Sequence, residues 1–316
     1  AGNFDKSNKR RFKRKGELKH VNGKGVFFVY GEYEDKELKQ LQQIELDVLK
    51  DFANVCDELE LPYFMVGGSA IGTVRHKGFI PWDDDIDVGM LRKDFERFKK
   101  FAVPRLEEKY TFNTMEENGV FPVPAMFMGK KGTKFIEEAF KNLPMDFGIR
   151  IDIIPFDSVS DDEKERKKQI YGAWFWSKLY ILRQIPAPNL TLKGIKKWIV
   201  RTICWTTHYT MKILCISPRW LYRQYKKYAD AYNHEDTEYI KLLDYTYPTK
   251  YMMKRRDVFP TVKMNFENIQ VEMPNNYDKV LSDIFGNYME LPPVEKRKNH
   301  YPHLLCLGNE NERTES

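Results

Sequence analysis

The sequence lacks long apolar runs and has few cysteines. No stretch of eighteen consecutive apolar residues occurs in the 316-residue chain, which excludes a membrane-spanning helix. The basic N-terminal region has no apolar core of the kind that a secretory signal needs, so we expect no such signal there. The four cysteines (Cys56, Cys204, Cys215 and Cys306) are scattered and show no metal-ligand spacing. This usage favours reduced thiols, and we predict a cytoplasmic location.

Acidic residues are missing from one long segment. Residues 166–229 hold fourteen lysines and arginines and no aspartate or glutamate, whereas the rest of the chain has a net charge of −8. A second basic run, residues 6–24, holds nine basic residues against Glu17 alone. Charge that is gathered in this way indicates an anionic partner, such as lipid headgroups, a phosphate-rich polymer or nucleic acid.

The overall composition is that of a folded protein. Apolar residues make up 42% of the chain and charged residues 31%, which is typical of a globular protein. We predict an α+β fold in which helices flank a mixed sheet. The expected divisions are a basic, partly disordered arm (1–31), the first part of the core (32–163), a basic amphipathic helical insertion (164–233), the completion of the core with a C-terminal helix (234–306) and a disordered tail (307–316).

Hydrophobic periodicity predicts the main elements. Leu41, Val48 and Phe52 recur at helical spacing and predict a long helix over 34–59 with one buried face. The β-branched run 148–156 predicts a strand that ends at Pro155. The other expected strands are 63–66, 86–90, 110–115 and 123–128, and the other expected helices are 92–101, 164–185, 192–216, 218–233 and 277–285.

The helix expected over 192–216 combines an apolar face with a basic one. The apolar face carries Leu192, Ile195, Ile199, Thr202, Tyr209 and Ile213, and the basic face carries Lys193, Lys197, Arg201, His208 and Lys212. Trp198 and Trp205 lie near the boundary between the two faces. Helices of this kind suit an anionic membrane surface, so we predict peripheral binding at the inner face of the membrane through residues 164–233. The alternative is a helical subdomain whose basic face is solvated.

Residues 67–88 gather a glycine turn, basic residues and acids. Gly67 and Gly68 break the strand before them, and Ser69 stands where a helix N-cap would stand, ahead of a short helix over 70–74. Backbone N–H groups at such a turn can bind a phosphate, and the Ser69 hydroxyl adds a further polar group. Positive charge on the following basic residues would offset more of the phosphate charge. The substrate-binding residues predicted here are Gly67, Gly68, Ser69, Arg75 and Lys77; a plain turn is the alternative.

The acids in this stretch predict a metal site. Asp85 and Asp87 alternate along the expected strand, so their side chains share one face. Two carboxylates on one face repel each other unless they share a cation, and oxygen ligands suit Mg²⁺ or Mn²⁺. Asp152, the one acid within the apolar strand 148–156, is the natural third ligand, because a buried carboxylate needs a charged partner. We predict Asp83, Asp85, Asp87 and Asp152 as metal ligands; a solvated acidic turn at 83–87 is the alternative.

The glycine turn, the Asp-x-Asp pair and the later Asp152 together resemble the nucleotidyltransferase fold. The longer pattern Gly-Gly-Ser-x-x-Gly-x-x-Arg-His-x-Gly-x-Ile-Pro-Trp-Asp-x-Asp-x-Asp resembles the signature of the LicD family, which includes the fukutin-type transferases. Supporting matches occur at 151–156, 274–277, 290–293 and 295–297, so the resemblance covers about residues 35–300. It implies a nucleotidyltransferase-like mixed sheet whose carboxylates hold divalent metal.

The resemblance implies transfer of a phosphorylated alcohol from a nucleotide diphosphate donor to a sugar hydroxyl. The implied group is phosphocholine, the donor is CDP-choline, and CMP leaves. The acceptor would be a teichoic acid or another lipid-linked or polymeric surface glycan. On this basis Asp85, Asp87 and Asp152 are the catalytic residues, with Asp83 supporting them, and Asp152 orients or deprotonates the acceptor hydroxyl. A polyol phosphate (ribitol or glycerol phosphate) from a related CDP-alcohol donor stays open.

Other interpretations of the motifs also stay open. The chain could be a nucleotidyltransferase acting on RNA or a small molecule, or a binding protein with a decayed site. We expect no nucleic-acid partner, because the basic helices carry tryptophans and long apolar faces. Trp82 is predicted to bind substrate, since it is the aromatic residue nearest the acids and choline suits an aromatic cage; packing under the loop is its alternative. We interpret His300 and His303 as part of a structural tail, because Pro302 separates them and no third ligand is near.

Overall fold

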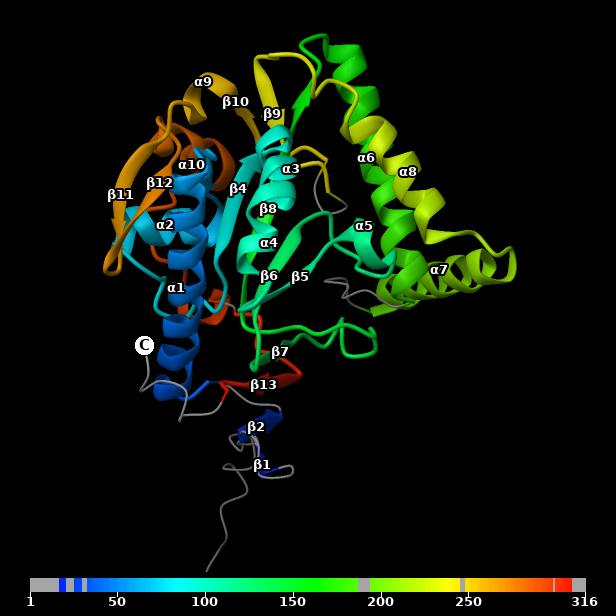
Figure 1. Ribbon diagram of the computed structural model, residues 1–316. Helices are drawn as coiled ribbons and strands as arrows, with labels where there is room; N and C mark the ends of the chain where they lie inside the picture. Colours follow the sequence, from blue (N-terminus) through cyan, green and yellow to red (C-terminus); the bar gives the residue numbers. More distant parts are fainter. Residues whose placement is uncertain are drawn as a thin grey trace, which may run out of the picture.

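A computed structural model describes residues 17–20, 26–29, 33–186, 194–244, 248–297 and 299–308. It shows a curled mixed sheet with helices on both sides (Figure 1). One path through the sheet runs β10-β9-β8-β4-β3, and β6, which also pairs with β5, lies against β8. The strands are β3 (Phe64–Met65), β4 (Asp87–Leu91), β5 (Tyr110–Asn113), β6 (Met126–Lys130), β8 (Arg150–Val159), β9 (Tyr239–Lys241) and β10 (Met252–Lys254). The predicted α+β class with a mixed sheet is confirmed.

Strand β8 is the centre of the sheet and is longer than predicted. It is parallel to β4 and antiparallel to β6 and β9. The prediction that it ends at Pro155 is wrong, because it continues to Val159. The backbone N–H of Asp152 donates to the carbonyl of Ile86, on the side of β8 where β4 lies. Backbone N–H groups point to alternate sides along a strand, so the nitrogen of Pro155 points to the other side of β8, where β6 and β9 pair. There, β6 pairs only as far as Ile153 and β9 begins at Asp157, so the N–H that proline lacks has no partner to lose.

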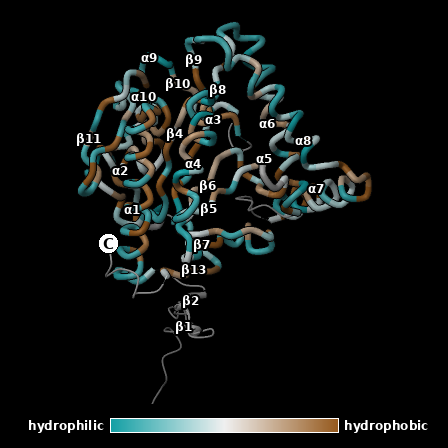
Figure 2. The backbone as a smooth tube through the Cα atoms, viewed as in Figure 1, coloured by the Kyte–Doolittle hydropathy of each residue, from teal (hydrophilic) through white to brown (hydrophobic). Residues whose placement is uncertain are grey.

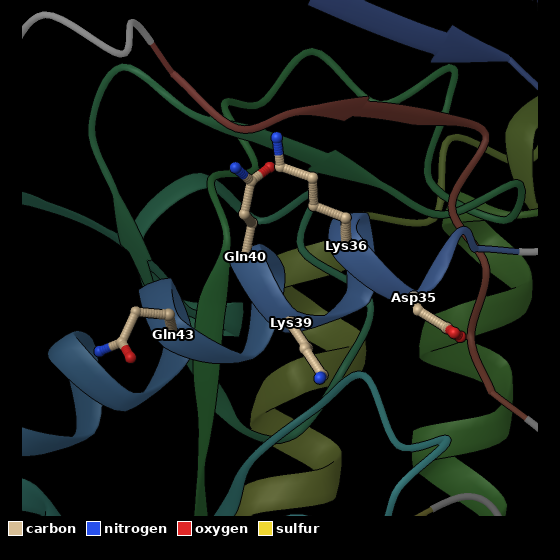
Figure 3. Close-up of a pocket in the computed structure, with 5 residues that line it drawn as sticks. All are labelled: Asp35, Lys36, Lys39, Gln40 and Gln43. Carbon is tan, nitrogen blue, oxygen red and sulfur yellow. The ribbon is translucent and has the colours of Figure 1, made fainter.

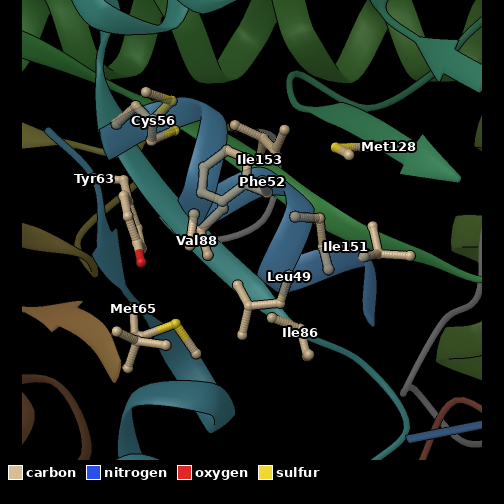
Figure 4. Packing of buried hydrophobic residues seen from close by; sticks show 14 of the residues in the cluster. Leu49, Phe52, Cys56, Tyr63, Met65, Ile86, Val88, Met128, Ile151 and Ile153 are labelled. Carbon is tan, nitrogen blue, oxygen red and sulfur yellow. The ribbon is translucent and has the colours of Figure 1, made fainter. Parts of the chain in front are cut away.

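Helix α1 (Asp35–Glu58) covers one face of the sheet. Its apolar side chains recur at helical spacing, so one side of the helix faces the sheet. Figure 4 shows this side packed against the strands: Leu49, Phe52 and Cys56 of α1 meet Val88 of β4 and Ile153 of β8. All of these side chains are buried, so the core fixes the position of β4 against β8.

Helix α2 (Gly67–His76) begins earlier than predicted. Gly67 has a φ of 60°, a left-handed conformation that glycine adopts without strain, and the helix starts there, directly after β3. The N-cap is therefore Val66, and the prediction that Ser69 caps the helix is wrong. Ser69 lies inside the first turn, where it is buried.

Helix α3 (Arg92–Phe101) has the predicted bounds and follows β4 directly. The hairpin β11–β12 packs beside α2, where the backbone N–H of Glu267 bonds to the carbonyl of Lys77 at 2.7 Å. The remaining elements near the sheet are α4 (Val103–Leu106), α5 (Met115–Asn118), α9 (Arg255–Val258), β11 (Val262–Phe266), β12 (Ile269–Met273), α10 (Tyr277–Phe285) and a 3₁₀ turn (Val294–Lys296).

The basic segment forms α6 (Glu163–Gln184), α7 (Gly194–Ile213) and α8 (Pro218–Ala229), on the side of the sheet away from α1 (Figure 1). Helices α6 and α8 pack together, and α7 lies against α6 through Cys204, His208 and Met211. The placement of His208 on the basic outer face is wrong, since it is buried and its Nδ1 lies 2.7 Å from the Leu182 carbonyl. Leu192 and Lys193 lie outside the described residues. No helix in the described segments is both long and apolar enough to cross a membrane.

A second sheet has the order β1-β2-β13-β7. Its strands are β1 (Glu17–His20), β2 (Val26–Val29), β7 (Lys134–Ile136) and β13 (Leu304–Cys306). Strand β13 pairs antiparallel with both β2 and β7. This pairing anchors the segment near residue 300 beside the loop that carries the predicted acids. The rest of the predicted arm and residues 309–316 of the predicted tail lie outside the described residues, and the domain divisions stay predictions.

Candidate active site

Asp87 and Asp152 are neighbours across the parallel strands β4 and β8, where they form one register pair. Burial and the nearby carboxylates of Asp85 and Asp152 raise the pKa of Asp87 well above its usual range. Burial also raises the pKa of Asp152, to about 7, although the Arg150 guanidinium acts in the opposite direction. Two predicted ligands from separate strands are thus brought together where a proton or a cation is needed to offset their repulsion.

Asp83 and Asp85 approach this pair from the loop before β4. The strand begins at Asp87, so the prediction that Asp85 lies on it is wrong. The alternation of burial nevertheless continues back through Ile86, which is buried, so Asp85 faces the same way as Asp87. Burial and the carboxylates of Asp85 and Asp84 raise the pKa of Asp83 to about 8. The Asp85 carboxylate therefore raises the pKa of each of the other three predicted acids, as a converging cluster would.

The glycine turn lies directly against these acids. A Cβ atom on Gly67 would come within 2.9 Å of Oδ2 of Asp87, and one on Gly68 within 2.7 Å of Oδ2 of Asp83. The N-terminus of α2 therefore faces carboxylates, which its dipole stabilises. The Ser69 hydroxyl accepts a hydrogen bond from the N–H of Asp87 at 2.9 Å, so it fixes β4 against α2.

The predicted substrate-binding residues Arg75, Lys77 and Trp82 come after the glycine turn in the chain. Lys77 is the exposed C-cap of α2, about 15 Å along the helix axis from Gly67 at 1.5 Å per residue. The Arg75 guanidinium donates to the Tyr288 carbonyl at 2.6 Å. Trp82 is half-buried, and the Arg297 guanidinium lies 4.4 Å from its ring centroid. Arg75 and Trp82 thus connect the motif to the C-terminal segment.

Asp84 and His300 form a contact that the sequence did not indicate. Asp84 is buried and accepts hydrogen bonds from the Tyr33 hydroxyl at 2.8 Å and from the backbone N–H of His300 at 2.7 Å. The His300 imidazole also approaches Asp85, with 3.1 Å between Nδ1 and Oδ2. Hydrogen bonds to Asp84 and Asp85 raise the pKa of His300 to about 12, so the imidazole is positively charged at neutral pH. His300 thus lies against the predicted acids, a contact that the interpretation as a structural tail did not include, whereas His303 pairs with Glu138.

Arg150 is a second cation beside the acids. Its Nε lies 3.0 Å from Oδ1 of Asp152, and its Nη2 lies 2.6 Å from Oε1 of Glu137. The guanidinium carbon stands 3.9 Å from the centroid of the Phe127 ring. Arg150 and Asp152 are two residues apart on one strand, so their shared face was a signal that the sequence offered and the prediction did not use.

A pocket opens beside the acid cluster. Its volume is about 190 Å³, and it is lined by Glu45, Asp84, Asp85, Val123, Phe127, Phe135, Glu137, Phe140, Arg150, Asp152 and His300. A larger hollow of about 480 Å³ lies along α1, but its lining residues Asp35, Lys36, Lys39, Gln40 and Gln43 come from one helix and point in different directions (Figure 3). The smaller pocket, which touches two of the predicted catalytic acids, is the candidate site.

The acids suit a divalent cation in chemistry, but they are not arranged around one. Among the described residues, no three His, Cys, Asp or Glu side chains form a group that could hold a metal as they stand. Asp85 pairs with His300 and Asp152 with Arg150 instead. The oxygen donors are those that Mg²⁺ or Mn²⁺ prefers, and their raised pKa values reflect a repulsion that a shared cation would offset. A metal would have to replace those two charge pairs, and its ligands stay a prediction.

Comparisons with known proteins agree with the motif. Residues 60–180 match the family model described as LicD/FKTN/FKRP, nucleotidyltransferase domain. The lipopolysaccharide cholinephosphotransferase LicD of Haemophilus influenzae is 27% identical over 273 residues, which cover 84% of this chain and 96% of that protein. The uncharacterized protein RT0683 of Rickettsia typhi is 26% identical over 129 residues, covering 39% of this chain and 40% of that protein. The matched model spans the glycine turn, the acid loop and Asp152.

Proposed function

This chain belongs to the LicD family, and we propose that it is a phosphotransferase that moves phosphocholine from CDP-choline to a sugar hydroxyl of a surface glycan, releasing CMP. The observation that carries the proposal is the pairing of Asp87 with Asp152 across β4 and β8, beside Asp83 and Asp85. Support for choline comes from the Haemophilus relative, whose name gives cholinephosphotransferase and lipopolysaccharide. A teichoic acid is a further candidate acceptor.

The proposed reaction needs a base and a means of offsetting phosphate charge. The acceptor oxygen forms a bond to the β-phosphorus of the donor as the bond from that phosphorus to the CMP oxygen breaks. We assign to Asp152 the role of orienting the acceptor hydroxyl or accepting its proton, for which its carboxylate must be deprotonated. Bound Mg²⁺ or Mn²⁺ would offset charge on the diphosphate, with Asp83, Asp85, Asp87 and Asp152 as its ligands. The α2 N-terminus and Gly67-Gly68 keep the carboxylates in place.

The proposal includes a nucleotidyltransferase-like core. The matched family model carries that description, and the mixed sheet places acids on two adjacent parallel strands, as the proposal requires. The basic segment 164–233 is then an insertion between β8 and β9. If this segment binds the glycan acceptor, the acceptor approaches from next to the nucleotide site and does not occupy it.

We also propose that α7 binds an anionic membrane surface at the inner face of the membrane. Large apolar side chains are exposed along it: Ile195, Trp198, Ile199, Ile203, Trp205 and Ile213. Trp198 is 67% exposed and Ile213 80% exposed, and apolar and polar positions interleave along α7 (Figure 2). Lysines and arginines alone supply its charge, so a second α7 packed against it would be repelled, whereas anionic lipid would be attracted. A lipid-linked glycan acceptor would be held at the same surface.

The defining experiment measures CMP release from three donors, CDP-choline, CDP-ribitol and CDP-glycerol, with a glycan acceptor and Mg²⁺ or Mn²⁺. The proposal expects CDP-choline to be consumed fastest and turnover to stop when the metal is chelated. Preference for a polyol donor would replace choline with a polyol phosphate and keep the reaction class. Nucleotide addition to RNA without CMP release would contradict the proposal as a whole.

A further inference from the structure

Glu45 presents an unpaired acceptor to the pocket beside the acid cluster. It lies on the buried face of α1 and is only 2% exposed, and its Oε2 atom has no hydrogen-bond partner. A cation that enters the pocket can approach this oxygen without displacing a hydrogen-bond partner. Burial and the carboxylates of Asp85 and Asp84 raise the pKa of Glu45 well above its usual range. These effects favour the uncharged acid, whereas a cation bound in the pocket would favour the carboxylate and be attracted to it.

Part of the pocket lining is apolar and aromatic. Phe127, Phe135 and Phe140 form it together with Val123, and none of these side chains can donate or accept a conventional hydrogen bond. The rings already hold one cation, because the Arg150 guanidinium lies 3.9 Å from the Phe127 centroid and 5.2 Å from that of Phe135. Aromatic faces attract cations in this way, most strongly where water is excluded.

The charges that line the pocket do not balance. Arg150 is matched by Asp152 and Glu137, which both contact it. The single imidazole of His300 lies against both Asp84 and Asp85, so it can offset at most one of those two carboxylates. The Arg150 charge also acts on Glu45, but the guanidinium is already shared between Asp152 and Glu137. The pocket lining therefore holds five carboxylates against two cationic side chains, an excess that a bound cation would reduce.

We propose that this pocket, which we call the Phe–Glu45 pocket (Glu45, Val123, Phe127, Phe135 and Phe140), binds the quaternary ammonium of the transferred choline. The inference rests on the proposed function and adds the subsite that selects the substrate. A quaternary ammonium has apolar methyl groups for the phenylalanines and a charge for Glu45, and it needs no hydrogen-bond acceptor. A ribitol or glycerol chain would leave its hydroxyls unpaired against the phenylalanine rings, which costs affinity.

The pocket adjoins the acid cluster, so one phosphocholine can place its ammonium in the pocket and its phosphate at the acids. Asp85 and Asp152 belong both to the pocket and to the acid cluster, so an ammonium in the pocket places the attached phosphate toward the predicted metal ligands. The pocket's volume of about 190 Å³ is below the roughly 300 Å³ at which sites for whole drug-sized ligands begin. It therefore takes a headgroup, and the cytidine lies elsewhere.

The test compares the full chain with Glu45→Gln and Phe140→Leu variants. Tetramethylammonium chloride is titrated into each protein by calorimetry, with 3,3-dimethylbutanol as the uncharged isostere of choline. We expect the wild-type protein to bind tetramethylammonium and not the alcohol, and each variant to lose about tenfold in affinity, the equivalent of 1.4 kcal/mol. Phe101→Leu, at an exposed phenylalanine of α3, is the matched control and should bind as the wild type does. Thermal melting of every variant checks that it is folded.

The same variants separate this inference from the proposed function. If CDP-choline is the donor and both variants keep the wild-type ratio of kcat/KM for CDP-choline over CDP-glycerol, the pocket assignment is wrong and the function stands. If Glu45→Gln loses Mg²⁺ affinity instead of tetramethylammonium affinity, Glu45 is a metal ligand and the assignment is again wrong. If tetramethylammonium binds through Glu45 and CDP-choline is not consumed, the pocket is supported and the function is contradicted.

Discussion

The Nδ1 atom of His300 lies 3.1 Å from Oδ2 of Asp85, so a cation from the C-terminal segment occupies one side of a predicted metal ligand. The backbone N–H of the same histidine bonds to Asp84, which also accepts from Tyr33. Asp84 thus connects Tyr33 and the backbone of His300 to the acid loop. Asp85 contacts only the His300 side chain among these groups, so a metal ion could replace the imidazolium there. Metal binding at Asp85 has to displace the imidazolium, and this competition can be measured.

Replacing His300 with alanine should strengthen metal binding. The imidazolium competes with Mg²⁺ for Asp85, while the backbone bond to Asp84 does not depend on the side chain. We expect the Kd for Mg²⁺, measured by calorimetry, to fall by about three- to tenfold, or roughly 1 kcal/mol. His303→Ala is the control, because His303 pairs with Glu138 instead. Weaker Mg²⁺ binding in the His300 variant would mean that the imidazole orients Asp85 for the metal.

Asp87→Asn and Asp152→Asn should each abolish most activity. Both changes keep the side-chain volume but remove the charge that would hold a cation over the phosphates, and Asp152→Asn also removes the proposed base. We expect kcat to fall by about 10²–10³-fold or more, as it does when an electrostatic catalytic group is lost. CMP release under saturating donor measures it. The control is Asp283→Asn on α10, at an exposed ion pair with Lys279, which should retain full activity. Near-normal turnover in the Asp152→Asn variant would show that Asp152 is not a catalytic residue.

The metal-free protein should lose stability as the pH rises. The folded-state pKa values of Asp83 (about 8) and Asp152 (about 7) lie above the value near 3.9 expected in the unfolded chain. Protonation therefore stabilises the folded protein: this contribution is fully present below about pH 4 and is lost as the pH rises through 7–8. We expect Tm without metal to be lower at pH 8.5 than at pH 5.5.

Added Mg²⁺ should raise Tm more at pH 8.5 than at pH 5.5, because ligand carboxylates must be deprotonated to bind it. The double variant Asp83→Asn with Asp152→Asn should show a flatter pH dependence without metal and a smaller response to Mg²⁺. Equal Mg²⁺ effects at both pH values would argue that these carboxylates do not bind the ion.

Membrane binding should depend on the charge and tryptophans of α7. Lys197 and Arg201 are exposed on this helix, beside Trp198. Lys197→Ser with Arg201→Ser should reduce pelleting with phosphatidylserine-containing vesicles, since each basic residue near such a surface contributes about 1 kcal/mol. Lys93→Ser with Lys100→Ser removes the same charge from α3 and serves as the control. If both double variants pellet alike, α7 has no special role in binding.

Local sequence patterns were sufficient for most of the elements around the site. Helix α3 has the predicted bounds, and the long helix α1 agrees with its prediction within a residue at each end, because both carry a clear apolar stripe. Strands β4 and β8 were also expected, and their acids were assigned to one cluster before any pairing was known. The predicted bounds of α2 and β8 were wrong because glycine and proline were expected to interrupt these elements, as they do on average. Instead α2 begins at Gly67, and β8 continues through Pro155.

Of the charged pocket residues that were not predicted, Glu45, Arg150 and His300 were missed for different reasons. Glu45 stands in the apolar stripe of α1, between Leu41 and Leu49, and an acid there is a signal that was available. Arg150 shares a strand face with Asp152 and was also visible in the sequence. His300 gives no such signal, because its contact with Asp85 depends on the pairing of β13 with β7 and β2.

The sequence by itself determined the acid motif, the glycine turn and the basic character of residues 166–229, because each depends on spacing along a few turns of helix or one strand. Only the tertiary structure decided which groups face those acids. The parallel register of β4 and β8 joins Asp87 to Asp152, and the second sheet delivers His300. The helix α1 adds Glu45, and β6, β7 and the chain after β7 supply the phenylalanines of the pocket. Such contacts depend on burial and strand pairing between distant segments, which no local spacing encodes.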